Sequence, residues 1–398
     1  MKFKLDYKKF FVTSALIMSA AGFAAADELG INAANLDGNK AEVVQENANE
    51  TAHIFQVMGT EGGGNFVYMH QYQSSGDPNQ IGELSAFVRQ VGNENKAKVR
   101  QLGMGVASSG LNAGFSHAYN FNLPITFYDL EDFQNYQVED YEVFLRQEGN
   151  GNVSRQLMQG HTQFAFGYQL GDDNKLRQEN TDRGNRNAAV AKQDGSDNEI
   201  IQEQAGAYSY AEALQLEDGS GNFAKQVQEG GRHVGKNDVD EGEPFNYQLG
   251  NIAQIKQTGM ENDARQYQNG EENYASIKQS GELNDASQNQ IGTSQVALTE
   301  QDGMDNDATI NQGSVLGDTD SVWAYQKQIG EENSSLINQL GSGHEAVSMQ
   351  FGNFNNADIN QSGSNSYSLV VQNNGGVVDT TVPTGFGITP VNIKKKKK

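Results

Sequence analysis

The sequence contains no cysteine, so neither disulfides nor Cys-ligated metals hold the chain together. Proline is also scarce, at 5 of 398 residues, and there is a single tryptophan. Hydrophobic residues make up only 36% of the chain, which is low for a protein that must bury an apolar core. Disordered chains share this low hydrophobicity, but they are typically rich in proline and show no fixed period. Something other than a large apolar core must therefore stabilise the fold.

Long apolar runs are missing after residue 26, so no later segment is apolar enough to span a bilayer as a helix. The first 26 residues have the order of a secretory signal peptide: several lysines, an apolar stretch over residues 10–23, and a small-residue site at residues 24–26. We therefore expect residues 1–26 to be removed, so that the mature chain starts near Asp27. Such a signal predicts Sec export through the periplasm and a final location outside the cell.

Basic residues are in the minority. Lys and Arg number 28 against 51 Asp and Glu, which gives a formal net charge of −23. So acidic a chain repels nucleic acid and anionic lipid, and we expect no nucleic-acid partner and contact with the outer-membrane surface only through assembly. The same charge helps to keep an exported chain soluble before it assembles.

What the chain does have is an internal repeat. A glutamine followed two residues later by glycine recurs along most of the chain, and between Gln257 and Gln312 this marker glutamine returns every 11 residues. The fuller pattern is Q-x-G-x-x-N-x-A-x-x-x-Q, which residues 268–279 (QNGEENYASIKQ) follow throughout. None of the five prolines lies within a clean copy, where it would remove a hydrogen bond between strands.

The spacing within the repeat fits a β-strand followed by a tight turn. In residues 273–279, Asn273, Ala275 and Gln279 fall on one face of a strand, together with the aliphatic residue between them. We expect this face to point inward, where stacked amides satisfy one another and the small alanine lets two strands approach. The residues that we expect in these inward ladders are Gln90, Asn95, Ala97, Gln101, Gln257, Asn262, Ala264, Gln268, Asn273, Ala275, Gln279, Asn284, Ala286, Gln290, Gln301, Asn306, Ala308, Gln312, Gln328, Gln339, Gln350, Asn355, Ala357 and Gln361.

Each 11-residue unit would contribute one strand and one turn, and two units would close a rung of about 22 residues. Rungs that stack at about 4.8 Å form an all-β solenoid with cross-β hydrogen bonding of the amyloid type. An 11-residue period also suits a right-handed coiled coil. That alternative is poor, because a glycine and an asparagine in every unit would destabilise the helix throughout.

The repeats divide the chain into blocks. We expect a signal peptide (1–26), degenerate repeats with a Gly-rich break (27–79), a first clear block (80–103), an aromatic and acidic insertion (104–146), a middle array (147–230), a break (231–247), the most regular array (248–374) and a tail (375–398).

No catalytic constellation is evident, and we expect neither an enzyme nor a cofactor. The six histidines are scattered without the spacing of a metal site. Acidic residues recur at the expected turns, at residues 172–173, 271–272, 305 and 331–332. Stacked carboxylates of this kind could bind Ca²⁺ between rungs, but we expect them chiefly to oppose premature aggregation.

The repeat resembles that of the curlins, the subunits of bacterial curli fibres. The resemblance covers most of residues 80–372, and it is specific because an amide, a glycine, an asparagine and an alanine must all fall in register. It implies a β-solenoid, a curli-type nucleator and an outer-membrane secretion channel as partners, and nucleated self-assembly into the amyloid of a biofilm matrix. Marker positions such as Gln268 and Asn273 would then lie in the amyloid core. The chain is much longer than a five-repeat curlin and carries the aromatic insertion in addition.

We therefore expect a structural subunit that polymerises end to end into an extracellular, adhesive fibre. The alternative is a monomeric acidic solenoid, an adhesin or binding module that holds a ligand with its insertion; the insertion could equally pack as a cap. Soluble solenoids need atypical polar ends, whereas open ends template further chains. The regular repeats continue almost to Gln372 without an evident cap, which favours the fibre.

Overall fold

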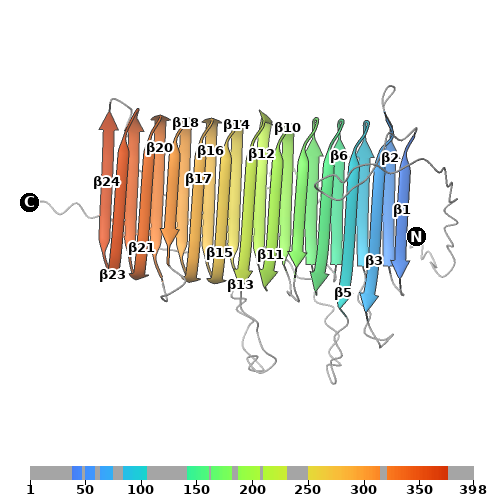
Figure 1. The fold of residues 1–398 in the computed structure, drawn as a ribbon, viewed down its shortest axis with the longest axis horizontal. Helices are drawn as coiled ribbons and strands as arrows, with labels where there is room; N and C mark the ends of the chain where they lie inside the picture. The colour runs from blue at the N-terminus through green and yellow to red at the C-terminus, as the bar shows by residue number, and fades with distance from the viewer. Residues whose placement is uncertain are drawn as a thin grey trace, which may run out of the picture.

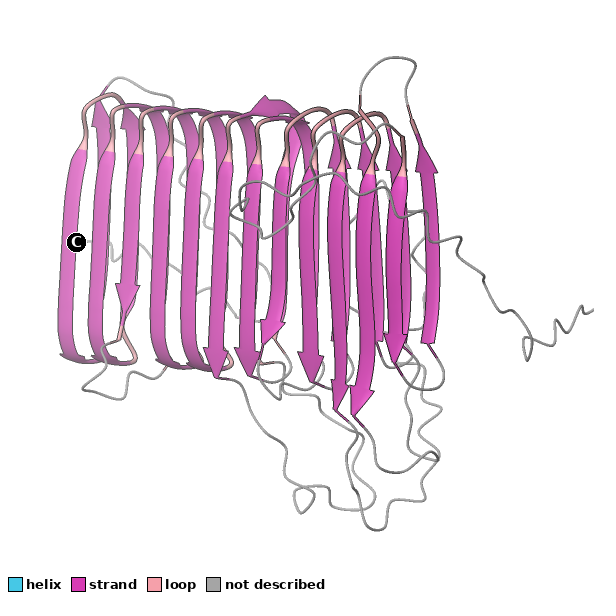
Figure 2. Ribbon diagram, turned by 45° about the vertical axis from the view of Figure 1, so that its right-hand side comes forward, coloured by secondary structure: helices cyan, strands magenta, loops and turns pink. Residues whose placement is uncertain are grey.

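The computed structural model describes residues 38–46, 50–58, 63–74, 84–104, 141–160, 163–181, 187–206, 209–230, 250–313 and 321–374. Within these ranges every regular element is a β-strand, and there is no helix. The 24 strands form two sheets of 12 strands each, which we call sheet A and sheet B. Successive strands alternate between the two sheets, so the chain winds as a β-solenoid (Figures 1 and 2). The predicted fold class is confirmed.

Sheet A contains the odd-numbered strands: β1 (Lys40–Glu46), β3 (Phe66–Ser74), β5 (Lys96–Met104), β7 (Val153–Gly160), β9 (Lys175–Thr181), β11 (Glu199–Gly206), β13 (Phe223–Gly230), β15 (Asp263–Glu271), β17 (Asp285–Thr293), β19 (Asp307–Gln312), β21 (Ser334–Ser342) and β23 (Asn356–Ser364). Sheet B contains the even-numbered strands: β2 (Glu50–Val57), β4 (Leu84–Val91), β6 (Tyr141–Glu148), β8 (Gln163–Leu170), β10 (Ala188–Ser196), β12 (Tyr210–Ser220), β14 (Ile252–Met260), β16 (Tyr274–Glu282), β18 (Val296–Met304), β20 (Trp323–Glu331), β22 (Glu345–Gly352) and β24 (Tyr367–Asn374).

Each strand pairs in parallel with the next strand of its own sheet, so one strand from each sheet makes a rung. The register keeps equivalent repeat positions together: in β14 and β16, Ala253 lies opposite Ala275 and Gln257 lies opposite Gln279. Stacked glutamines are 22 residues apart in most of this regular array, as predicted, and 27 apart across the connection from β19 to β20. In the middle array the separation reaches 24, as from β8 to β10, because the connections there are longer. Strands β1 to β3 belong to the same two sheets, so the described part of the degenerate N-terminal repeats extends the stack.

Alanine and aliphatic side chains fill a thin interior between the sheets. Ala264, Ala275 and Ala286 are fully buried, and the aliphatic residues Ile277 and Ile310 are at most 1% exposed. Charged side chains alternate with them and point outward, as the strand period requires. The predicted inward face of the repeat is therefore the observed one.

The two edges of the solenoid differ. From β4 onward, every turn from sheet B back to sheet A is a four-residue Gly-x-x-Asn segment. In the turn at residues 281–284, Gly281 has φ 108°, and a Cβ there would lie 2.0 Å from the carbonyl oxygen of Gly303 in the next rung. The third turn residue, Leu283, has φ 58°, a left-handed conformation that costs a non-glycine residue roughly 1–2 kcal/mol. This uniform edge leaves no room for insertions.

The longest connections all lie on the opposite edge, where the chain passes from sheet A to sheet B. They join β3 to β4, β5 to β6, β13 to β14 and β19 to β20. One predicted boundary needs correction: β6 begins at Tyr141 and pairs with β4, so residues 141–146 belong to the solenoid rather than to the insertion. Phe144 of β6 stacks between Phe87 and Phe166 at ring-centroid distances of 5.0 and 5.2 Å. The aromatic residues of this segment suggested an insertion, but the ring of Phe144 stacks on the rings of neighbouring strands. Residues 105–140 lie outside the described residues.

Candidate functional site: amide ladders and open ends

A column of glutamine side chains runs without a break along the inside of sheet B. The Nε2 of each glutamine donates to the Oε1 of the glutamine one rung further on, at N···O distances of 2.7–3.1 Å. Each interior Nε2 also reaches sheet A, as when Gln279 donates to the backbone oxygen of Asp263 at 2.8 Å. The column therefore joins rung to rung and sheet to sheet. Its members are Gln56, Gln90, Gln147, Gln169, Gln193, Gln215, Gln257, Gln279, Gln301, Gln328, Gln350 and Gln372.

The equivalent column of sheet A has one interruption. Gln45, Gln71 and Gln101 begin it. Met158 and Asn180 then occupy the next two rungs in register. The column resumes with Gln204, Gln228, Gln268, Gln290, Gln312, Gln339 and Gln361, at 2.9 Å per step. Every predicted marker glutamine thus lies in one of the two columns.

Asparagines form a further ladder along the uniform edge. Asn284 is typical: its backbone N–H and its Nδ2 donate to Oδ1 of Asn262, at 3.2 and 2.9 Å, and its Nδ2 also donates to the oxygen of Gly303 at 3.0 Å. This ladder explains why Asn follows the turn in every rung. It contains Asn39, Asn65, Asn95, Asn152, Asn174, Asn198, Asn222, Asn262, Asn284, Asn306, Asn333 and Asn355. The predicted ladder residue Asn273 lies in a shorter ladder along the opposite edge, which we call the insertion edge. Its backbone N–H donates to Oδ1 of Asn251 at 3.2 Å, and its own Oδ1 accepts from the backbone N–H of Gln295 at 3.1 Å.

A third glutamine column was not predicted from the sequence. It lies inside sheet A at the position expected to hold only aliphatic filler, and its members are Gln156, Gln178, Gln202, Gln226, Gln266 and Gln288. Small residues face it from sheet B in three consecutive rungs: Gly167, Ala191 and Ala213. The signal was present in the sequence as a second glutamine two residues before the marker, as in Gln266 before Gln268 and Gln288 before Gln290.

The glutamine columns have a direction, since each member donates its Nε2 to the glutamine of the next rung toward the C-terminal end. The first member of a column therefore has an Oε1 without a donor. Gln156, which follows Val99, and Gln204, which follows Asn180, are both buried with an unpaired Oε1. By analogy, the first glutamine of each column at the outer end of the solenoid must also have an Oε1 without a donor.

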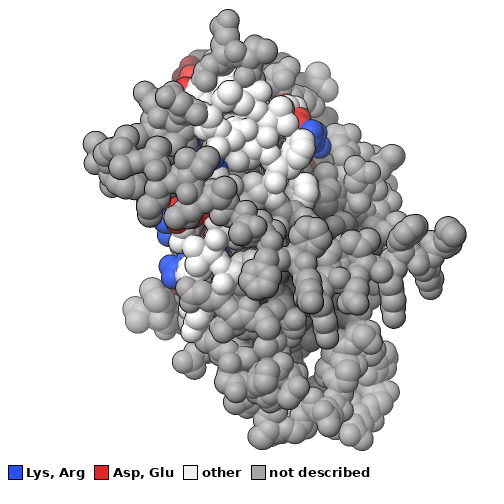
Figure 3. Space-filling model, turned by 90° about the vertical axis from the view of Figure 1, so that its right-hand side faces the viewer, with Lys and Arg blue, Asp and Glu red and all other residues white. Residues whose placement is uncertain are grey.

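The two ends of the solenoid are complementary. At the first rung, Gln45 and Gln56 begin their columns, and no described residue donates to either Oε1. At the last rung, Gln361 and Gln372 end the columns, with no further glutamine to receive their Nε2 groups. Strands β1, β2, β23 and β24 each have a partner on one side only, and their described residues include no proline or cap. Viewed from the β1–β2 end, most of the described atoms in sight are uncharged (Figure 3).

Few titratable groups are buried in the described part of the chain. Burial by itself raises the pKa of Glu179, but its hydrogen bond from Arg177 and the charges of Arg177 and Arg155 outweigh burial, so the pKa lies below its ordinary value. Burial raises the pKa of Glu212, although Gln254 donates to its carboxylate at 2.8 Å. Neither carboxylate faces a nucleophile or a second acid in an arrangement suited to catalysis.

The acidic turns do not converge on one site. Residues 172–173, 305 and 331–332 lie on the uniform edge, whereas residues 271–272 lie on the insertion edge. Within the described ranges, no group of three or more His, Asp or Glu is placed to hold a metal ion.

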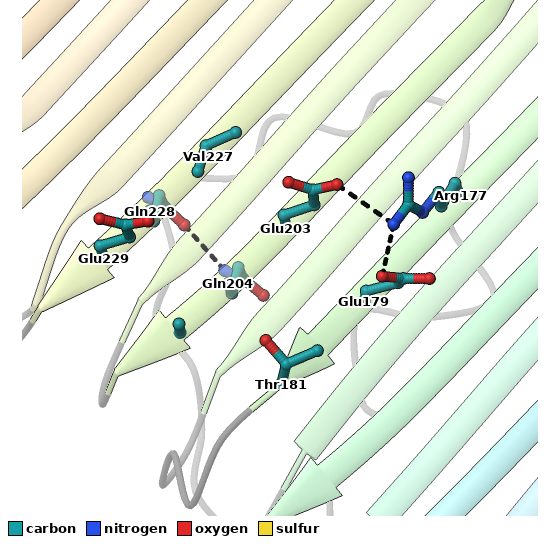
Figure 4. Close-up of a pocket in the computed structure, with 9 residues that line it drawn as sticks. Arg177, Glu179, Thr181, Glu203, Gln204, Val227, Gln228 and Glu229 are labelled. Atoms are coloured by element: carbon teal, nitrogen blue, oxygen red, sulfur yellow. Dashed lines mark hydrogen bonds and ion pairs between the residues drawn. The ribbon is translucent and has the colours of Figure 1, made fainter.

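A shallow depression of about 240 Å³ lies on the outer face of sheet A, over β9, β11 and β13 (Figure 4). On its rim Arg177 forms ion pairs with Glu179 at 2.7 Å and with Glu203 at 3.3 Å. The surface is hollow here because the side chains of Ala205 and Val227 are small. The described lining offers polar contacts but no nucleophile with an adjacent base.

No protein-family model matches the chain, and no curated protein matches it either. Across the described residues no helix is long and apolar enough to cross a membrane. The likeness to the curlins therefore depends on the repeat residues themselves.

Proposed function

We propose that the chain is a structural subunit of an extracellular fibre of the curli type, and that it grows by end-to-end stacking of solenoids. The observation that carries this proposal is the complementarity of the two ends. A second copy whose β1 and β2 follow β23 and β24 would place Gln45 under Gln361 and Gln56 under Gln372, and both columns would continue with the same donor direction.

The same placement continues the other interior contacts. Asn39 would donate to Oδ1 of Asn355, and Ile54 would follow Val370 at the equivalent inward position of sheet B. Joining two like ends would instead place donor against donor or acceptor against acceptor. The arrangement is therefore heterologous and open, which generates filaments rather than closed dimers.

Exposed strand edges are the part of a sheet that other chains most readily extend. The described ends lack the charged inward residues and prolines with which soluble sheet proteins block this extension. The secretory signal, the acidic composition and the resemblance to the curlins support a location in a biofilm matrix, with a nucleator and an outer-membrane channel as partners.

A pair of substitutions on β24 tests the proposal. Val370 packs against the interior and Val371, next to it, is 46% exposed. Val370→Asp would place a charge in the continuing interior, at a cost of several kcal/mol, whereas Val371→Asp would not. We expect Val370→Asp to form no fibres and to stop growth of wild-type fibres at one end only, and Val371→Asp to grow normally.

Fibre growth can be followed by electron microscopy of seeded reactions. Normal growth of Val370→Asp would contradict stacking at this end. A wild-type chain that stays monomeric under all conditions would favour the second candidate, a monomeric adhesin. The observation that supports this candidate is that the longest connections all lie on one edge.

A further inference from the structure

The outer face of sheet A is strongly basic in its N-terminal half, although the whole chain is acidic. On β5, β7 and β9 the outward positions alternate with the buried residues and carry six cations and one carboxylate, Glu179. The cations stack in register, because Lys98 lies opposite Arg155 and Arg155 lies opposite Arg177. They are Lys96, Lys98, Arg100, Arg155, Lys175 and Arg177.

The same face is acidic further along the solenoid. Strands β15, β17 and β19 each begin with an aspartate, and the register places Asp263 opposite Asp285 and Asp285 opposite Asp307. Arg265 is the only cation at an outward position of these three strands, and it pairs with Asp263. Sheet A therefore presents a face with a positive and a negative half.

In both halves like charges stack on neighbouring strands. Burial, and then the positive charges of Arg155 and Arg100, lower the pKa of Lys98. The pKa of Asp263 is raised to about 6, chiefly by burial; Arg265 opposes the shift and Asp285 adds to it. Burial and the charge of Asp285 also raise the pKa of Asp307. Each half would gain from a surface of the opposite sign.

We infer that the outer face of sheet A is a self-complementary interface, on which a second copy of this chain docks face to face with its solenoid axis reversed. The partner follows from the charge pattern, because a face that bears both signs in separate halves is matched by its own reversed copy. A polyanion would match only the β5–β9 half and would be repelled by β15–β19.

The register defines the docking geometry. A two-fold axis parallel to the strands, between β11 and β13, places Lys175 of one copy opposite Asp263 of the other and Lys96 opposite Asp307. All four residues stand at the first position of their strands, so they share one column of the face. The centre of the contact is the depression of Figure 4, where Ala205 and Val227 let the two faces approach. Two copies with parallel axes would instead set cations over cations.

This contact is on the flank and is separate from the open ends. It can therefore be tested in the Val370→Asp background, which we expect to block end-to-end growth and leave only pairing. One variant carries Lys96→Glu and Lys175→Glu, and the other carries Asp263→Lys and Asp307→Lys. A matched control, Lys256→Glu with Lys278→Glu, makes the same charge change on the outer face of sheet B.

The measurement is sedimentation velocity over a range of concentrations, with circular dichroism to verify folding. We expect the parent and the control to form dimers that dissociate as NaCl rises from about 50 to 500 mM. Each charge-reversed variant alone should bind itself at least ~10-fold more weakly, since two symmetry-related pairs of contacts become repulsive. An equimolar mixture of the two variants should restore dimers, because the faces are again opposite in sign.

A mixture that associates no better than its components would overturn the inference, as would a parent that stays monomeric at low salt. Capture of an acidic polysaccharide by the parent, without self-association, would reassign the basic half to that ligand and also overturn it. Growth of the Val370→Asp chain into fibres would count against the end-stacking proposal alone, since pairing by flanks is scored separately as dimers.

Discussion

Replacing Gln279 by glutamate tests the amide ladders at a single atom. The side chain of Gln279 is fully buried, and its Nε2 lies 2.8 Å from the oxygen of Asp263, 2.9 Å from the oxygen of Asn284 and 2.9 Å from Oε1 of Gln301. A carboxylate of the same shape would offer no N–H to any of these oxygens. The amide loses its two N–H groups, while the oxygen of Asn284 keeps the backbone N–H of Asp263. At about 1–3 kcal/mol for each lost donor, we expect a loss of roughly 2–6 kcal/mol in the free energy of unfolding at neutral pH.

Two control variants separate charge from shape. Gln279→Met removes the donors without adding charge, and Met158 already occupies the equivalent position in sheet A. Lys278→Gln alters the neighbouring exposed side chain and should change stability by less than about 0.5 kcal/mol. We expect the order Lys278→Gln, Gln279→Met, Gln279→Glu from least to most destabilising at pH 7.5.

The pH dependence of the deficit has a definite sign. Burial among oxygen atoms raises the folded-state pKa of the carboxyl that Gln279→Glu introduces. The folded chain therefore tolerates its protonated form best, and the deficit relative to wild type should grow as pH rises from about 4.3, the unfolded value, through the raised folded value.

Urea unfolding of the Val370→Asp chain at high salt, followed by far-ultraviolet circular dichroism at pH 4.5 and 7.5, measures these differences. A Gln279→Glu deficit no larger than that of Lys278→Gln would refute the inward ladder. A deficit equal at both pH values would refute the role assigned to the charge.

Three further outcomes follow from the turns, the flank and the insertion edge. Leu283→Gly should raise the unfolding free energy by about 0.5–1 kcal/mol, because glycine relieves the left-handed strain at φ 58°. Gly281→Ala should instead destabilise the chain and slow fibre growth. Urea unfolding measures the change in stability, and seeded reactions measure the growth. Because the folded pKa of Asp263 is raised to about 6 from an ordinary value of 3.8, ionisation disfavours the folded state as pH rises through this window; Asp263→Asn should flatten this part of the stability–pH profile. Deleting residues 106–139 should leave the circular dichroism spectrum and fibre growth intact, because it spares β5 and β6, and loss of either would place that segment in the solenoid.

The sequence was sufficient to predict the inward face and the rung. Successive side chains of a strand point to opposite faces. The repeat has an amide at every eleventh residue and an alanine four residues before it, as in Gln279 and Ala275, so only one arrangement buries both. The stacked glutamines in turn specify parallel register, because a slip would break every bond in the column. These features recur from repeat to repeat, so they can be recognised in the sequence without a structure.

Features that depend on which residue of sheet A faces which residue of sheet B were not predictable. The column that includes Gln202 occupies space vacated by Ala213 on the opposite strand, a pairing that no single repeat contains. The left-handed residue in each Gly-x-x-Asn turn is Glu, Asp, Gly, Leu or Phe in different rungs, so composition gives no signal for it. Tyr141 was assigned to the insertion because its block, residues 141–146, departs from the motif, yet backbone pairing with β4 includes it regardless of side chain.

The central claim is that one copy continues the ladders of the next. Cryo-electron microscopy of fibres grown from the mature chain tests it most directly, because it resolves the junction between subunits. We predict an unbroken stack of strands about 4.8 Å apart, in which β1 and β2 of one copy follow β23 and β24 of its neighbour and Gln372 donates to Gln56 across the junction. Fibres whose subunits meet in any other way, or a chain that forms no fibres with this spacing, would contradict it.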